Sequence, residues 1–152
     1  MARSNADLLA IKAELTNNPL ALSGYLALTA PNDEANANAL NLVRVELQID
    51  REAIPVSEIS KCIDRDEFGA LSPADQKYLD LVLGGGNVNP KTGGEVREGF
   101  LQMFGSGTET RNNLLALLTE SANRVEHLFK AGTLAVGGTV TPSDVAAARA
   151  AV

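Results

Sequence analysis

The sequence is poor in the residues that carry most catalytic and metal-binding chemistry. It has one cysteine, one histidine and no tryptophan in 152 residues, and aromatic residues make up only 4% of it. A single cysteine forms no disulfide within the chain, and one cysteine with one histidine cannot complete a structural zinc site. With so few large rings, the core has to be built from Leu, Val, Ile and Ala, and contacts with neighbouring subunits are a plausible source of further stability.

Long apolar runs and an excess of positive charge are also missing. No run approaches the roughly 20 apolar residues that span a bilayer, and the first seven residues lack the apolar core of a signal peptide. We therefore expect synthesis in the cytosol and no membrane contact. The net charge of −6 argues against a protein that binds phosphate backbones by charge. An acidic surface suits a protein past which DNA slides, but it equally suits ordinary solubility.

The strongest periodic pattern lies between Thr110 and Ala131. Its apolar residues recur at helical spacing and form one stripe, made of Leu114, Leu117, Leu118, Ala122, Val125, Leu128 and Phe129. Thr108 or Thr110 can cap the start, and Gly132 supplies a stop. The pattern predicts one long helix, and because its stripe has to be buried, we expect it at the centre of the core.

Shorter helices are predicted around it from capping residues and breaks. They cover approximately residues 7–15, 32–42, 58–65, 73–83, 95–104 and 145–152. The clearest start is Ser72-Pro73-Ala74-Asp75, because Ser caps, Pro suits the first helical position and an acid follows three residues after the cap. The fold expected is mainly α: a single-domain bundle of five to seven short helices around the long one at residues 1–132, then a flexible extension at 133–152.

Residues 43–49 break the helical pattern. Val43, Val45, Leu47 and Ile49 alternate with polar residues, and a period of two is typical of a strand. No partner strand is evident elsewhere in the sequence. The segment is therefore either extended and paired with another subunit, or a continuation of the helix before it, and the sequence does not separate these two alternatives.

The candidates for catalysis are isolated residues. Asp64, Asp66 and Glu67 form an acidic cluster, but acids near helix ends are commonly solvated, and a catalytic pair requires burial. Cys62 fits the apolar face of a short helix as a small core residue. His127 lies beside the predicted stripe, where a lone histidine is more often structural than a general base. We expect no enzymatic activity and no metal or cofactor.

The loop from Gly85 to Thr92 approximates the phosphate-binding pattern G-x-x-x-x-G-K-[ST]. Pro90 occupies the place of the second glycine, where it has no N–H to donate and the wrong φ. The segment before the loop also reads as helix, whereas the motif follows a strand. The loop is therefore expected to link two helices and not to bind a nucleotide.

A set of breaks and helix starts resembles a known class of virus proteins. An opening helix leads into Asn18-Pro19-Leu20, an I-x-x-x-E-F-x-A-L turn covers 63–71, and a Phe-Gly-x-Gly-Thr hinge at 104–108 precedes the long helix. This pattern resembles small helical proteins encoded in the head and neck gene clusters of tailed bacteriophages. The resemblance covers about three quarters of the chain, without 133–152, and consists of helix punctuation, not of a catalytic signature.

The resemblance implies a structural virion protein, assembled in the cytoplasm of a bacterial host. The most favoured role is a head–tail connector, or adaptor, which forms a ring between the portal and the tail or head-completion proteins, with DNA passing through unbound. The alternative is a capsid decoration or other virion component, and a small monomeric binding protein is less favoured. A ring of identical subunits needs two complementary surfaces. The residues expected to supply them are Val43, Val45, Leu47, Ile49, Leu134, Val136, Val140 and Val145.

Overall fold

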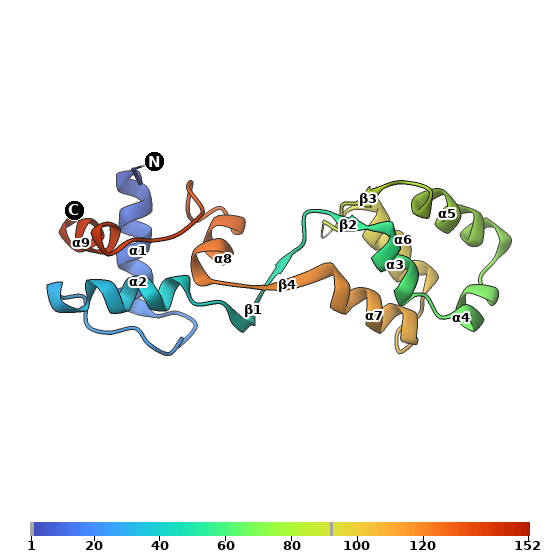
Figure 1. Ribbon diagram of the computed structural model, residues 1–152, viewed down its shortest axis with the longest axis horizontal. Helices are drawn as coiled ribbons and strands as arrows, with labels where there is room; N and C mark the ends of the chain where they lie inside the picture. The colour runs from blue at the N-terminus through green and yellow to red at the C-terminus, as the bar shows by residue number, and fades with distance from the viewer. Residues whose placement is uncertain (1, 92) are drawn as a thin grey trace. The chain divides into compact units, whose positions relative to one another are not determined.

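The chain folds into two helical units, one inserted into the other. The computed structural model describes residues 2–91 and 93–152, and helices make up 55% of the protein, which confirms the mainly α class. The described residues form nine α-helices, one short 3-10 helix and four strands (Figure 1). Unit 1 contains Met1–Ile49 and Ser121–Val152, and unit 2 contains Asp50–Glu120.

Unit 1 is built on helices from both ends of the chain. They are α1 (Asn5–Asn17), the 3-10 helix η1 (Ala30–Asn32), α2 (Asp33–Asn41), α8 (Arg124–Lys130) and α9 (Pro142–Ala150). α9 packs against both α1 and α2. The buried apolar core consists of Ile11, Leu15, Ala37, Leu40, Val125, Leu128, Leu134, Val140, Val145 and Ala148. Side chains from residues more than 100 positions apart therefore share one core.

The segment 133–152 belongs to this core, so the expectation of a flexible extension is wrong. Leu134, Val140 and Val145 are each at most 2% exposed. The Asn41 side chain donates to the Val140 carbonyl at 2.7 Å and accepts from the Val140 N–H at 2.9 Å. The short Ala and Val side chains of α9 allow it to pack closely against α1 and α2. The expected boundary at residue 132 does not coincide with the division into units.

A charged pair is buried in unit 1 between α8 and α1. Arg124 donates from Nε and Nη2 to the two carboxylate oxygens of Glu14, at 2.8 and 2.9 Å. The Tyr25 hydroxyl donates to the same carboxylate at 3.1 Å, and Arg124 Nη1 lies 2.8 Å from His127 Nδ1. Burial and then the Arg124 charge lower the pKa of His127, and burial followed by Glu14 raises the pKa of Tyr25.

Unit 2 is formed by one continuous stretch of chain. Its helices are α3 (Val56–Cys62), α4 (Arg65–Gly69), α5 (Pro73–Leu83), α6 (Glu95–Met103) and α7 (Glu109–Leu118). Strands β2 (Ile54–Pro55) and β3 (Asn87–Val88) pair antiparallel. The buried apolar core is Ile54, Ile59, Leu79, Val88, Phe100, Phe104, Leu114 and Leu118. The Ser72 cap and the start of α5 at Pro73 confirm the prediction for that helix.

The long central helix predicted from Thr110 to Ala131 is wrong, because the chain leaves helical geometry in the middle of it. α7 ends at Leu118, strand β4 (Thr119–Ala122) follows, and α8 starts afresh at Arg124. Asn123 and Glu126 form a capping box at that start, each side chain accepting from the other's backbone N–H. The apolar stripe continued in phase across β4, so periodicity alone concealed the break.

Strand β4 supplies the partner that the sequence did not reveal for residues 43–49. β1 (Arg44–Asp50) is a strand, so the helical alternative is wrong, and it pairs with β4 in a two-stranded sheet within the chain (Figure 1). Gln48 Nε2 donates to Ser121 Oγ at 3.2 Å, and the Arg51 N–H donates to the Leu118 carbonyl at 3.0 Å. We call this two-stranded sheet the β ribbon.

Candidate interaction surfaces

The acidic cluster in unit 2 has a structural role that its side-chain contacts define. Asp64 caps α4 by accepting from the N–H groups of Asp66 and Glu67. Glu67 caps α7: its two carboxylate oxygens accept from the N–H groups of Glu109 and Thr110, both at 2.8 Å. Hydrogen bonds from Thr110 and then Glu109 lower the pKa of Glu67. Both carboxylates accept hydrogen bonds from the N-terminal ends of helices, an arrangement that serves folding.

The other two candidates for catalysis also take structural positions. Cys62 is half-buried beside the apolar core of unit 2, where burial raises the pKa of its thiol. A raised pKa reduces the thiolate fraction that a nucleophile needs. His127 lies against Arg124 in unit 1, as described above.

The glycine-rich loop does not form a phosphate cradle in its described part. Val88 is buried in the β2–β3 pair, and Pro90 is buried as well. Arg97 donates to the Pro90 carbonyl at 3.4 Å, so part of the loop backbone is already used within unit 2. Thr92, the last residue of the pattern, lies outside the described residues.

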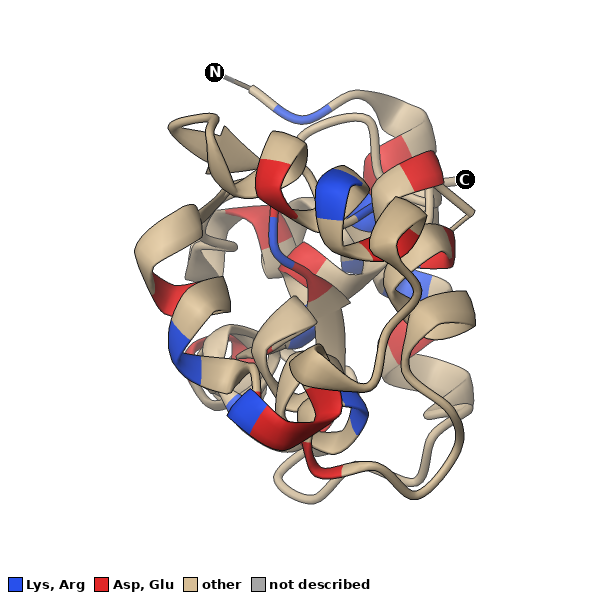
Figure 2. Cartoon of the chain, turned by 90° about the vertical axis from the view of Figure 1, so that its right-hand side faces the viewer, with Lys and Arg blue, Asp and Glu red and all other residues tan. Residues whose placement is uncertain are grey.

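Charged residues and potential metal ligands are spread over the described part of the chain and do not gather at one site. Figure 2 shows Lys and Arg interspersed with Asp and Glu along the described chain. No group of three or more His, Cys, Asp or Glu residues able to hold a metal ion occurs within residues 2–91 and 93–152. Of the helices that the structure describes, none has the length and apolar character needed to cross a membrane.

The predicted interface residues divide into exposed and buried sets. Val43 and Val45 are 60% and 81% exposed, whereas Leu47 is buried. Ile49 and Val136 are half-buried. The remaining three, Leu134, Val140 and Val145, are buried in the core of unit 1 and offer nothing to a neighbour in this conformation, which corrects their assignment.

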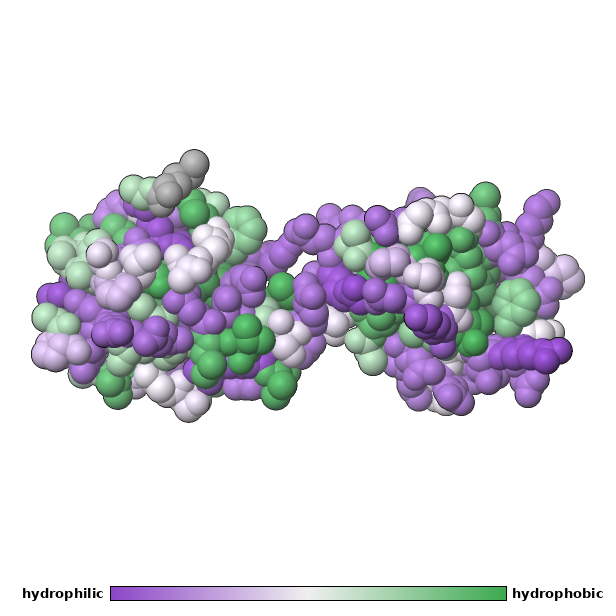
Figure 3. Space-filling model, viewed as in Figure 1, coloured by the Kyte–Doolittle hydropathy of each residue, from purple (hydrophilic) through white to green (hydrophobic). Residues whose placement is uncertain are grey.

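Exposed apolar residues gather at the start of the β ribbon. Leu42 is 54% exposed and precedes Val43 and Val45. Figure 3 shows apolar surface close to the position that Figure 1 gives to β1. Each ribbon strand has only one strand neighbour among the described residues, which leaves a second edge of β1 and of β4 without a strand partner. Open edges with apolar side chains are templates for pairing with another chain.

Helix α5 exposes a second apolar stripe that the sequence analysis overlooked. Its inward residue Leu79 is fully buried, but Leu81 is 76% exposed, Ala74 is exposed and Tyr78 is half-buried. Ala74, Tyr78 and Leu81 are spaced four and three apart, so they share the outward face of the helix. This spacing of apolar residues was the sequence signal from which the exposed face could have been predicted. We call these three residues the α5 surface.

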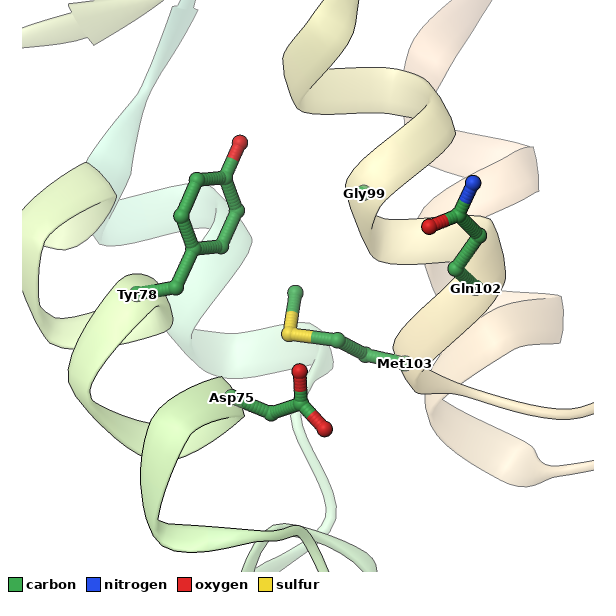
Figure 4. Close-up of a pocket in the computed structure, with 5 residues that line it drawn as sticks. All are labelled: Asp75, Tyr78, Gly99, Gln102 and Met103. Atoms are coloured by element: carbon green, nitrogen blue, oxygen red, sulfur yellow. The ribbon is translucent and has the colours of Figure 1, made fainter.

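Beside the α5 surface, an open cleft of about 240 Å³ separates α5 from α6. It is lined by Asp75 and Tyr78 of α5 and by Gly99, Gln102 and Met103 of α6 (Figure 4). In Figure 4 the Met103 side chain extends from α6 toward α5 and lies next to the Asp75 carboxylate, below the Tyr78 ring. A Cβ atom on Gly99 would lie 3.1 Å from Tyr78 Cε1, so glycine at this position lets the Tyr78 ring lie close against α6.

The comparisons with known proteins add no identification. No protein-family model, no curated protein and no solved structure matches the chain. The assignment of a role therefore depends on the surfaces described above and on the pattern of helix punctuation.

Proposed function

We propose that this protein is a structural subunit of a tailed-phage particle, a head–tail connector that assembles into a ring between portal and tail around the DNA channel. The single observation that carries the proposal is the open-edged β ribbon with Leu42, Val43 and Val45 exposed beside it. The helix punctuation that resembles phage head and neck proteins indicates the particle to which such a subunit would belong.

The β ribbon suits head-to-tail assembly because its two edges are different. One edge belongs to the seven-residue β1 and the other to the four-residue β4. A ring of identical subunits requires two unlike surfaces that complement each other, and pairing of β1 with β4 of the next copy meets that requirement. Neither strand contains the Lys or Pro residues with which monomeric proteins guard an edge.

The charges along β1 are also largely occupied within the chain. Arg44 turns into unit 1, where it donates to the Ser23 carbonyl at 2.6 Å, and it lies 3.8 Å from Glu46. The charge that would otherwise repel an approaching strand is thereby partly offset. In this proposal the α5 surface, which lies in unit 2, is left for a different protein of the particle, either portal or tail.

The position and copy number in particles that contain this protein test the proposal. Quantitative mass spectrometry should give about a dozen copies per particle, a number that fits the neck, and electron cryo-microscopy should place them there. Hundreds of copies on the shell would instead establish the capsid decoration alternative. Absence from particles would overturn both.

Single variants test the ribbon as the contact between copies. Val45→Lys introduces an edge-guarding charge on β1 and should abolish incorporation into the ring, because lysine on an edge opposes strand addition. Leu20→Lys is the matched control, since Leu20 is an exposed leucine of the same unit, outside the ribbon. If both variants enter the ring equally well, the ribbon is not the contact.

A further inference from the structure

We propose that the cleft between α5 and α6 binds an arginine side chain of the partner protein that docks on the α5 surface. This inference rests on the proposed function, because it supplies the chemistry by which unit 2 would recognise its partner. It assigns the cleft to a guanidinium group held by Asp75 and Tyr78, with the partner's apolar residues lying on Ala74 and Leu81.

The polar atoms of the cleft match a cation. Asp75 Oδ2 accepts from the Ser72 hydroxyl at 2.7 Å, while Oδ1 accepts no hydrogen bond from the residues that the structure describes. Tyr78 Oη likewise has no hydrogen-bond partner among them, although its ring is half-buried. A carboxylate oxygen with free acceptor capacity beside an aromatic ring and a polarisable thioether is the environment that a guanidinium group prefers.

Arginine fits this geometry better than lysine does. Its planar guanidinium can stack on the Tyr78 ring and at the same time donate sideways to Asp75, whereas the lysine ammonium acts as a point charge. Arginine and tyrosine are also the residues that most often carry binding energy at protein interfaces. Asp80, by contrast, does not line this cleft; it lines a second, mostly apolar recess together with Lys77 and Tyr78.

The size of the cleft favours a side chain over a small-molecule ligand. Pockets for drug-sized ligands and cofactors run from about 300 to 1,000 Å³ and enclose most of the ligand, whereas this cleft measures about 240 Å³ and is open. Its position next to an exposed apolar stripe places it where a docking helix or loop would pass. A long side chain that reaches sideways from such a segment fills the cleft while its backbone stays outside.

The test is a titration of the isotope-labelled protein with N-acetyl-arginine amide, followed by amide chemical shifts in NMR spectra. We expect saturable shifts at Asp75, Tyr78, Gly99 and Met103. N-acetyl-citrulline amide has the same shape without the charge, and its affinity should be roughly tenfold lower because a charge-assisted bond is lost. Equal binding of the two probes, or shifts spread over the surface without saturation, would overturn the assignment.

Variants of the cleft sharpen this test. Asp75→Asn should weaken the arginine probe by a similar factor, and Asp80→Asn, which removes the same charge from a residue that does not line the cleft, should not. Because Asp75 also supports the start of α5, Gly99→Ala provides an independent variant: its methyl group would displace the Tyr78 ring without changing charge and should weaken the probe. Equal effects of Asp75→Asn and Asp80→Asn would show that the probe responds to the overall negative charge of α5 and not to the cleft, and would refute the inference.

The two proposals can fail separately. If the protein is found as a neck ring but the arginine probe does not bind, the cleft assignment is wrong and the connector role stands. If the probe binds as expected but the protein is absent from particles, the connector role is wrong, and the cleft remains a site for an arginine of some other protein.

Discussion

The cores of the two units differ in the kinds of side chain that they bury. Unit 1 buries polar and charged residues among its aliphatic side chains: Asp7, Glu14, Asn36, Arg44 and Arg124. Among the described residues of unit 2, only Thr110 is a buried polar residue, and two phenylalanines, Phe100 and Phe104, fill its centre. Unit 1 therefore combines apolar packing with matched hydrogen bonds and charges, whereas unit 2 depends mainly on apolar packing.

The difference extends to groups left without partners. Five buried side-chain atoms of the described residues make no hydrogen bond, and all lie in unit 1: Asp7 Oδ2, Asp33 Oδ1, Asn36 Nδ2, Arg44 Nε and Arg149 Nε. Burying an unsatisfied polar atom costs about 1–3 kcal/mol. The core of unit 1 is therefore the more vulnerable of the two, because loss of a single partner leaves a buried charge unpaired.

The largest effect should come from breaking the buried pair of unit 1. Arg124→Met leaves the Glu14 carboxylate buried without its cation and should lower the free energy of unfolding by about 3–5 kcal/mol, measured by urea denaturation. The control is Arg51→Met, because Arg51 pairs at 2.9 Å with Glu58, whose side chain is 40% exposed, and this pair should contribute far less to stability. Equal losses in the two variants would mean that burial does not set the cost.

In unit 2 the corresponding test removes apolar volume. Leu79→Ala empties part of a fully buried site and should cost about 2–5 kcal/mol, with hydrogen exchange accelerated in unit 2. Leu81→Ala changes the exposed neighbour on the same helix and should stay within about 0.5 kcal/mol of the unchanged protein. If exchange in unit 1 accelerates as much as in unit 2, the units do not unfold independently.

A smaller effect should follow from removing helix caps. Thr141 accepts from the Asp144 N–H at the start of α9, and Ser72 accepts from the Asp75 N–H at the start of α5. Thr141→Ala and Ser72→Ala should each cost about 0.5–2 kcal/mol, seen as faster exchange in unit 1 and in unit 2 respectively. Unchanged exchange in α9 after Thr141→Ala would show that packing alone holds that helix.

The smallest effect is a difference in acid sensitivity between the units. His127 has a pKa below its ordinary value of 6.5, so folding favours its neutral form next to Arg124, with Glu14 partly opposing that shift. The stability that this provides is complete above pH 6.5 and is lost as the pH falls through the folded pKa. After correction for the intrinsic exchange rates, hydrogen exchange in unit 1 should therefore accelerate as the pH is lowered from 7. The His127→Gln variant should not show this pH dependence.

Unit 2 should respond only in a more acidic range. The pKa of Glu58 is lowered by its bond to Arg51 and that of Glu67 by its bonds to Thr110, both from 4.5. Their contributions are present above pH 4.5 and are lost as the pH falls further. If hydrogen exchange in unit 2 accelerated at the same pH as in unit 1, this ordering would be wrong.

Helix starts were the part of the fold that the sequence made predictable. Ser72 begins α5 where its capping pattern indicated, since a cap is a local interaction of residues three apart. The last helix, α9, begins at Pro142, three residues before the expected start at 145. The break at Thr119 was missed because the apolar stripe of the expected helix continued in phase across β4. The Asn123 to Glu126 capping box inside that stripe was the local signal against one long helix.

The candidate surfaces were only half predictable for a similar reason. Val43 and Val45 could be named because alternation marks a strand, but the alternation of β1 does not tell which partner covers it. Leu134, Val140 and Val145 look alike in sequence to exposed valines and leucines, and only long-range packing against α1 and α2 buries them. The cleft beside Tyr78 lies between two helices whose lining residues are about 20 positions apart in the sequence, so no local sequence pattern predicts it.

The insertion of one unit within the other has a consequence for synthesis on the ribosome. Unit 2 is a single stretch that ends at Glu120, so it has all its residues before the final segment has been made. Unit 1 waits for α8 and α9, whose side chains complete its core and supply the cation for Glu14. Until Arg124 has been synthesised, the Glu14 carboxylate in α1 lacks its cation, and the nascent chain holds a complete inner unit flanked by an incomplete outer one.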